Sequence, residues 1–78
     1  MTKIADLKPG EKAKILHFIK GQAGYRQRLL AMGLTPGSEF TVIRKAPLGD
    51  PIQIQIRNAH LTLRKTEVDL LEVERVSP

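Results

Sequence analysis

The sequence contains no cysteine, and this absence excludes several kinds of stabilisation and chemistry. A chain without thiols has no disulfide framework, no thiolate metal site and no cysteine nucleophile. Its stability must come from packing, helped in some small proteins by oligomerisation. Because 78 residues provide one modest core, we expect residues 1–78 to form a single domain, as a monomer or as a homo-oligomer.

Long hydrophobic runs are also absent. The N-terminal segment MTKIADLKPGEK lacks an apolar stretch of signal-peptide length, and no run of about 18 apolar residues occurs anywhere. We therefore expect a chain that is neither exported nor inserted in a membrane. Its predicted location is the cytoplasm.

Aromatic residues are scarce, with two Phe, one Tyr and no Trp. Barrels that bind single-stranded nucleic acid stack bases on exposed rings, and grooves for Pro-rich peptides are lined by aromatic side chains. The pattern instead places Phe18 and Phe40 at strand positions that the core occupies, and Tyr25 on the apolar stripe of a helix. The aromatic content disfavours both ligands, so we expect no nucleic-acid partner.

Groups for catalysis are few. The sequence has two histidines and no GxSxG, HExxH, Walker or GxGxxG motif, so we predict no enzymatic activity and no resident cofactor. His17 and His60 are the candidate metal ligands, but neither has a second His two or four residues away. A divalent transition-metal site shared between protomers, with Asp50 or Asp69 as a further ligand, stays open.

The charge that is present is mostly positive. Thirteen Lys and Arg against eight Asp and Glu give a net charge of +5. Residues 1–65 carry twelve basic and four acidic side chains (+8), and residues 66–78 carry one basic and four acidic (−3). A positive body favours an anionic partner, which is a nucleic acid, a membrane surface or an acidic protein face.

A helix is predicted between two sets of strands. The segment YRQRLLAM places Tyr25, Leu29 and Met32 on one helical face, and Gly33 follows where a left-handed C-terminal residue is wanted. We expect this helix over about 22–33. Alternating apolar residues and Pro-Gly turns predict strands over about 12–19, from Phe40, over 52–56, from Leu61 to Leu63, and over 71–76.

Thr66 and Asp69 have the spacing of a small capping box, which predicts a helical turn over about 66–70. With five to six short strands and frequent turn signals, the predicted fold is mainly β. A small, partly open SH3-like barrel with one inserted helix fits best, and an OB-fold is the alternative.

The loop APLGDP, residues 46–51, is stiffer than a simple connection requires. Its two prolines restrict φ, and Gly49 allows a turn between them. We expect the loop to present Leu48 and Asp50 to a partner at the barrel rim. Basic side chains of the helix, and of the outward-facing polar side of the strands over 52–64, also favour binding of a partner. Arginines on a surface also serve simply to solvate it. The candidate partner-binding residues are Arg26, Arg28, Leu48, Asp50, Arg57 and Arg64.

The run YRQRLLAMGLTPGSEFTVIRKAPLGDPIQIQIRNAHLTLRKTEVDLLEV resembles the FeoA family, the small cytosolic component of bacterial ferrous iron uptake. The order and spacing of MGL, PG, APLGDP and LTLR carry the resemblance, and Val68 departs from it where many members have Ala.

This resemblance implies an SH3-like barrel without enzymatic activity. It also implies a role in supporting or regulating the membrane transporter FeoB by binding its cytosolic GTPase region, at the inner membrane. The alternatives are a metal-sensing module and a nucleic-acid-binding module of the same fold. A related barrel occurs in iron-dependent repressors.

Overall fold

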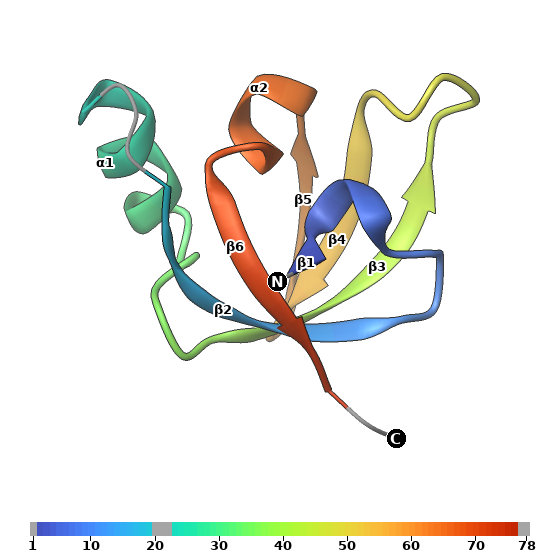
Figure 1. The fold of residues 1–78 in the computed structure, drawn as a ribbon, viewed down its shortest axis with the longest axis horizontal. Coiled ribbons are helices and arrows are strands. Elements are labelled where there is room, and N and C mark those ends of the chain that lie inside the picture. Colours follow the sequence, from blue (N-terminus) through green and yellow to red (C-terminus); the bar gives the residue numbers. More distant parts are fainter. Residues whose placement is uncertain (1, 20–22, 77–78) are drawn as a thin grey trace.

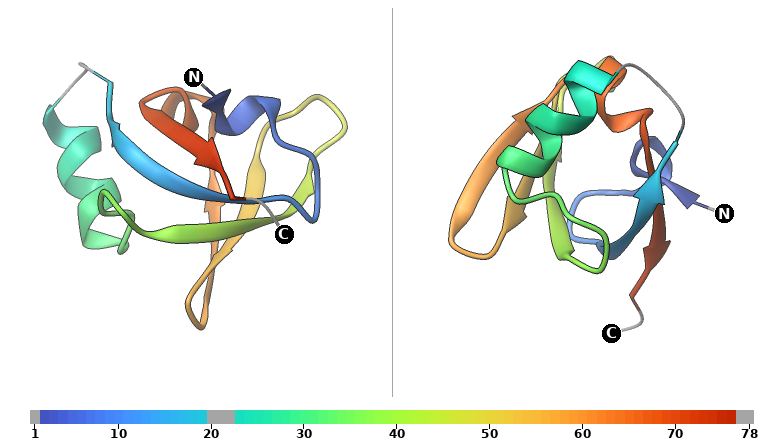
Figure 2. Two further views of the ribbon diagram at one scale, coloured as in Figure 1. Left: turned by 60° about the horizontal axis from the view of Figure 1, so that its bottom comes forward. Right: turned by 90° about the vertical axis from the view of Figure 1, so that its left-hand side faces the viewer.

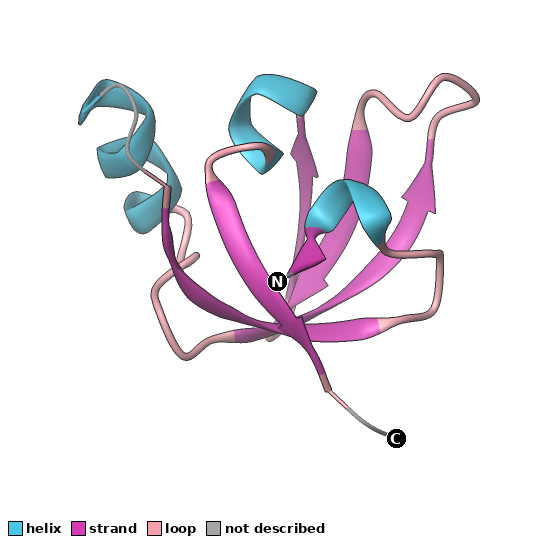
Figure 3. Cartoon of the chain, viewed as in Figure 1, coloured by secondary structure: helices cyan, strands magenta, loops and turns pink. Residues whose placement is uncertain are grey.

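The computed structural model describes residues 2–19 and 23–76. The elements appear in Figure 1, and Figure 3 distinguishes helices from strands. In chain order they are β1 (Thr2–Lys3), the 3₁₀ turn η1 (Ile4–Asp6), β2 (Lys12–Phe18), α1 (Ala23–Ala31), β3 (Glu39–Lys45), β4 (Ile52–Ile56), β5 (Ala59–Leu63), α2 (Lys65–Val68) and β6 (Leu71–Arg75). The predicted mainly β fold is confirmed.

The six strands form one antiparallel sheet in the order β1-β6-β2-β3-β4-β5. The sheet curls around the core (Figure 2). Within residues 2–19 and 23–76, β1 and β5 end the sheet without pairing to each other. The SH3-like barrel is therefore partly open, as the strand pattern predicts.

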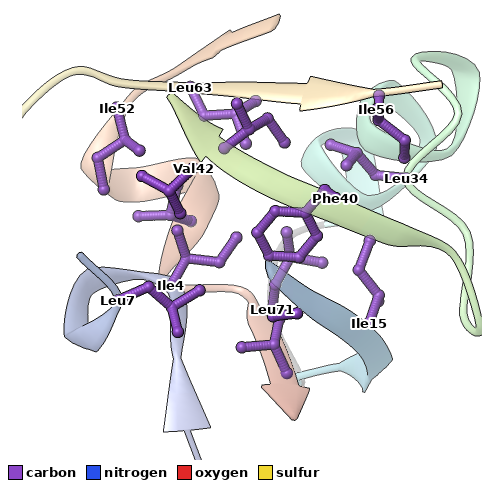
Figure 4. Packing of buried hydrophobic residues seen from close by; sticks show 14 of the residues in the cluster. Ile4, Leu7, Ile15, Leu34, Phe40, Val42, Ile52, Ile56, Leu63 and Leu71 are labelled. Atoms are coloured by element: carbon purple, nitrogen blue, oxygen red, sulfur yellow. The ribbon is translucent and has the colours of Figure 1, made fainter. Parts of the chain in front are cut away.

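The core follows the alternation of apolar residues along the strands. In β4, Ile52, Ile54 and Ile56 are buried, whereas Gln55 between them is exposed. Phe40 from β3 lies inside the same cluster, which Figure 4 shows at close range. Each such side chain contributes roughly 1.5–3 kcal/mol when fully buried, so this inner face holds the barrel together.

Helix α1 ends as its C-terminal signal predicts, but two residues earlier than position 33. Gly33 has a φ of 93°, the left-handed conformation that terminates a helix. The backbone N–H of Leu34 donates to the carbonyl of Leu29 at 3.0 Å, and Gly33 donates to Leu30 at 3.0 Å. The predicted limit of 33 includes this left-handed glycine, which is not itself helical, and the last helical residue is Ala31. The predicted first residue, 22, lies outside the described residues.

The predicted helical turn is present as α2, but its limits shift by one and two residues and the predicted cap is wrong. The helix spans Lys65–Val68 and not 66–70. Thr66 and Asp69 do not form the cap; the Glu67 carboxylate instead accepts a hydrogen bond from the backbone N–H of Arg64 at 3.0 Å. An acidic residue at the third helical position satisfies a free N–H at the start of a helix in the same way as in a capping box.

Two N-terminal elements are not among the predictions. In β1, Thr2 pairs with Val73 and Lys3 pairs with Glu72, and η1 follows directly. Ile4 is fully buried, so this segment contributes to the core. A two-residue strand is too short to show alternation, which explains why the sequence pattern does not reveal it.

Candidate partner-binding rim

Three segments far apart in the sequence lie along one end of the barrel. In Figure 1 they are α1, α2 and the connection between β3 and β4, residues 46–51. We call this surface the rim. An ion pair joins α1 to α2, and a hydrogen bond joins residues 46–51 to α2.

An ion pair joins α1 to α2. The Arg28 Nε atom lies 3.7 Å from the Glu67 Oε2 atom, and the two side chains are 67% and 6% exposed. The other Glu67 oxygen accepts the Arg64 backbone N–H. Because Arg28 is mostly exposed, solvent screening keeps the contribution of this pair to stability small. The pair places the Arg28 guanidinium beside the buried Glu67 carboxylate.

A hydrogen bond joins the β3–β4 connection to α2. The Asp50 Oδ1 atom accepts the backbone N–H of Lys65, the first residue of α2, at 2.9 Å. Within the connection, the N–H of Gly49 donates to Ala46 at 2.7 Å and the N–H of Ala46 donates to Pro51 at 3.0 Å. Asp50 therefore holds α2 in place, a structural role that its sequence context does not reveal.

Leu48 is the most exposed apolar side chain of the rim. It is 96% exposed, at the tip of the connection held by the Asp50 bond. Single exposed apolar side chains are common on soluble domains, but one on a loop that is held by hydrogen bonds loses little conformational freedom when a partner covers it. Leu30 of α1 is also exposed, at 36%.

Arg26 of α1 lies against β2. Its guanidinium carbon is 5.6 Å from the centre of the Phe18 ring, which is within the range of a cation–π contact. The contact orients Arg26 while leaving its side chain exposed. Arg64, just before α2, is exposed as well. The rim thus combines an apolar tip with oriented positive charge.

Arg57 does not belong to the rim. It lies in the two-residue turn Arg57–Asn58 between β4 and β5, with a left-handed φ of 55°. This turn and the β3–β4 connection are at opposite ends of β4, about 16 Å apart for a strand of this length. Near the turn is a shallow polar pocket of about 280 Å³. Its lining residues are Lys12, Glu39, Phe40, Thr41, Gln55 and Arg57.

The two histidines are not brought together. His17 lies on β2 opposite Glu72 of β6, whereas His60 lies on β5 opposite Gln55 of β4. Both side chains are exposed, and β3 and β4 separate their strands. Within the part of the chain that the structure describes, no three His, Asp or Glu side chains gather as a metal site would require. The two candidate ligands therefore lie on strands that are not neighbours in the sheet.

Sequence reasoning misses one residue of the rim, Glu67. It is 4% exposed and contacts both Arg28 and the backbone of Arg64. A signal is present, because Glu67 follows Arg64 by three residues, the spacing of the acidic member of a capping box. The unfavourable cap residue Arg64 hides that signal.

A model of the FeoA domain family matches residues 2–75 of this chain. The chain belongs to the FeoA family. The predicted family membership is thereby confirmed.

A curated relative places a FeoA sequence and a transporter in one polypeptide. This is the Fe(2+) transport protein A/Fe(2+) transporter FeoB fusion protein of Porphyromonas gingivalis. The chain is 33% identical to it over 75 residues, which are 96% of this chain and 9% of the fusion protein. The FeoA domain therefore spans only a small part of that relative.

Solved structures of FeoA proteins have the same fold. The iron(II) transport protein A of Clostridium thermocellum has a TM-score of 0.87 and 43% identity, covering 96% of this chain and 46% of that one. A Stenotrophomonas maltophilia FeoA, solved in complex with zinc and described as an SH3 domain protein, has a TM-score of 0.81. It is 22% identical, over 95% of this chain and 91% of that one, and supports the fold alone.

Neither helix is suited to crossing a bilayer. Over residues 2–19 and 23–76, no helix is long and apolar enough to span a membrane.

Proposed function

We propose that this chain is an accessory protein of bacterial ferrous iron uptake that binds the cytosolic GTPase region of FeoB through the rim. The fusion protein of Porphyromonas gingivalis carries the proposal, because it joins a FeoA sequence to FeoB in one polypeptide. Two modules joined in one chain meet at a high effective concentration, so the fusion favours direct contact between them. In cells, the proposal locates the chain at the cytoplasmic face of the inner membrane.

The rim has the chemistry of a binding face. Leu48, 96% exposed, supplies an apolar anchor that gains free energy when a partner covers it. The exposed guanidinium groups of Arg26 and Arg64 attract an acidic surface and speed the encounter. Because hydrogen bonds already hold the loop, little conformational freedom remains to be lost on binding.

A titration against the isolated GTPase region of FeoB tests the proposal. We expect saturable binding by the parent chain and at least tenfold weaker binding by a Leu48→Ser/Arg26→Gln variant, since each lost anchor of an interface costs about 1 kcal/mol or more. The matched control is Arg57→Gln, which also removes an exposed arginine but at the other end of β4. It should bind as the parent does.

Two results would overturn the proposal. No binding by the parent chain would exclude direct docking, and an equal loss in Arg57→Gln would exclude the rim as the interface. Arg28 is a poor choice for charge reversal. A glutamate there would lie beside the buried Glu67 carboxylate and would destabilise the fold itself.

The nucleotide state of FeoB separates two modes of action. If the chain merely steadies the transporter, its affinity is the same with GDP and with a non-hydrolysable GTP analogue. If it biases the nucleotide state, the two affinities differ by the factor through which it shifts that state. The same titration with both nucleotides distinguishes these modes.

The alternative functions have their own signatures. A nucleic-acid module binds generic single-stranded RNA with an affinity that falls steeply with salt. A metal sensor gives saturable calorimetric binding of Fe(II), Mn(II) or Zn(II) that His17→Ala or His60→Ala abolishes. Either result, without FeoB binding, would replace the proposal.

A further inference from the structure

Strand β5 leaves one edge of the sheet open. It pairs with β4 on one side and is last in the strand order. Of residues 2–19 and 23–76, none forms a strand against its other side. The hairpin of β4 and β5 projects from the rest of the chain in the left view of Figure 2.

The geometry of the hairpin identifies which backbone groups are free. A two-residue turn makes its flanking residues, Ile56 and Ala59, a hydrogen-bonded pair. Since bonded and non-bonded pairs alternate, His60 and Thr62 turn their N–H and C=O groups away from β4. Neither residue has a backbone hydrogen bond elsewhere in the described ranges. Two donors and two acceptors therefore line the edge in register.

This edge lacks the usual protection against pairing. Natural edge strands carry an inward charge, a proline, a bulge or a covering segment. The sequence of β5, AHLTL, has no proline and no Lys, Arg, Asp or Glu. Its pairing with β4 runs from Ile52–Leu63 to Ile56–Ala59 without a register shift, whereas the β2–β6 and β3–β4 pairs each contain one.

The charges around β5 select the partner. Arg57 precedes the strand and Arg64 follows it, and both are exposed. Neither belongs to the ion pairs formed among the described residues. A positive residue therefore lies next to each end of β5, which favours acidic residues at the ends of an extended segment paired with the strand.

A second copy of this chain is a poor occupant. If two β5 strands paired antiparallel about Leu61, Arg57 of one copy would lie opposite Lys65 of the other, at both ends of the pair. Facing like charges destabilise strand pairing. The charge pattern thus disfavours self-association.

We propose that the β5 edge binds an acidic extended segment of a partner protein by strand addition. Backbone hydrogen bonds to His60 and Thr62 provide the affinity, and Arg57 and Arg64 provide the preference for acidic ends. The surface shares Arg64 with the rim, but His60, Thr62 and Arg57 lie outside the rim, and the proposal does not rest on binding to FeoB.

A synthetic peptide serves as the probe. It has blocked termini, alternating Val and Thr at its centre and two Glu at each end. We expect it to shift the amide signals of His60 and Thr62 in NMR spectra of the full chain and to slow the hydrogen exchange of both amides. Amides of the rim should not change. Shifts confined to the rim, or none at all, would overturn the proposal.

Two changes test the backbone bonds. Thr62→Pro removes an outward N–H that β4 does not use, and an edge strand tolerates proline at such a position. We expect peptide affinity at least about tenfold lower, with Thr62→Ser binding as the parent does. If Thr62→Pro fails to fold, a peptide N-methylated along one edge tests the same bonds with the parent chain. Unchanged affinity for peptides methylated on either edge would refute strand addition.

Two further arms test the charges and the occupant. Arg57→Gln/Arg64→Gln should weaken binding of the acidic peptide, and a peptide with Lys in place of Glu should bind far more weakly to the parent. Equal affinity for both peptides would exclude the acidic preference.

Sedimentation without peptide tests whether a second copy occupies the edge. We expect no association through this edge. A dimer that Thr62→Pro disrupts would identify a second copy as the occupant instead.

Discussion

The two connections at the ends of β4 differ in length and in how they are held. Residues 46–51 join β3 to β4, and their backbone is fixed by internal hydrogen bonds and by Asp50, which binds the first N–H of α2. The turn Arg57–Asn58 joins β4 to β5 with two residues. There Arg57 takes a left-handed φ of 55°, which is unfavourable for a side chain with a Cβ atom.

The difference shows what each connection is for. A two-residue turn is sufficient to join antiparallel strands and to fix their register, even with some backbone strain. The longer connection holds α2 through Asp50 and presents Leu48 to solvent. Its extra residues therefore serve the rim, where we propose that a partner binds.

Replacing residues 46–51 with Asn-Gly should have the largest effect. The barrel should still fold, but its free energy of unfolding should fall by about 2 kcal/mol, because α2 loses its N-terminal hydrogen bond and the loop loses its own. Urea denaturation measures the change, with the intact chain as reference. An unchanged free energy of unfolding would show that the loop does not support α2.

Asp50→Ala isolates one contact of that connection. We expect a loss of about 1 kcal/mol in the free energy of unfolding, the usual effect of removing a side-chain acceptor at a helix start. Asp50→Asn keeps an oxygen for the Lys65 N–H and is the control, with most of the stability retained. If both variants lose the same amount, the negative charge matters and the hydrogen bond does not.

Arg57→Gly tests the shorter connection in the opposite direction. Relief of the left-handed conformation should raise the free energy of unfolding by about 0.5 kcal/mol, after allowance for the greater freedom of glycine in the unfolded chain. Thermal and urea unfolding measure the gain. Arg57→Ala, which keeps the Cβ atom, should show none, and a gain in both would point to charge and not to backbone conformation.

A contact outside both connections gives the smallest effect, seen only in acid. The Lys8 N–H, 2.6 Å from Glu11 Oε1, and then Arg75, 2.9 Å from Oε2, lower the pKa of Glu11 below its usual 4.5. The resulting stability is present above pH 4.5 and is lost as the pH falls through the lower folded pKa.

Glu11→Gln should therefore flatten the decline of stability below pH 4.5 and leave the differences between the two β4 connections unchanged. Urea denaturation across this pH range checks it. An equally steep acid decline in the variant would assign the effect to other carboxylates.

Local patterns predicted much of the fold. Alternating isoleucines located β4, and Gly33 with the apolar residue after it identified the end of α1, because these signals act over a few neighbouring residues. The strand β1 was not predictable in this way. Its two residues gain their place only by pairing with β6, some 70 residues later.

The site was less predictable for the same reason. The bond between Asp50 and Lys65 joins residues 15 apart, and the pair of Arg28 with Glu67 joins residues 39 apart, so no local pattern reveals either contact. The sequence named Arg28 and Asp50 as candidates for partner binding, but only the structure shows that both also hold α2. The structure also places Arg57 at the opposite end of β4 from the rim and its candidate residues.

Hydrogen exchange of the chain, with and without the GTPase region of FeoB, tests the central claim most directly. Our account predicts slower exchange of amides in α1, α2 and residues 46–51, with residues 57–63 unchanged. Protection confined to residues 57–63, with the rim exchanging as in the free chain, would contradict it.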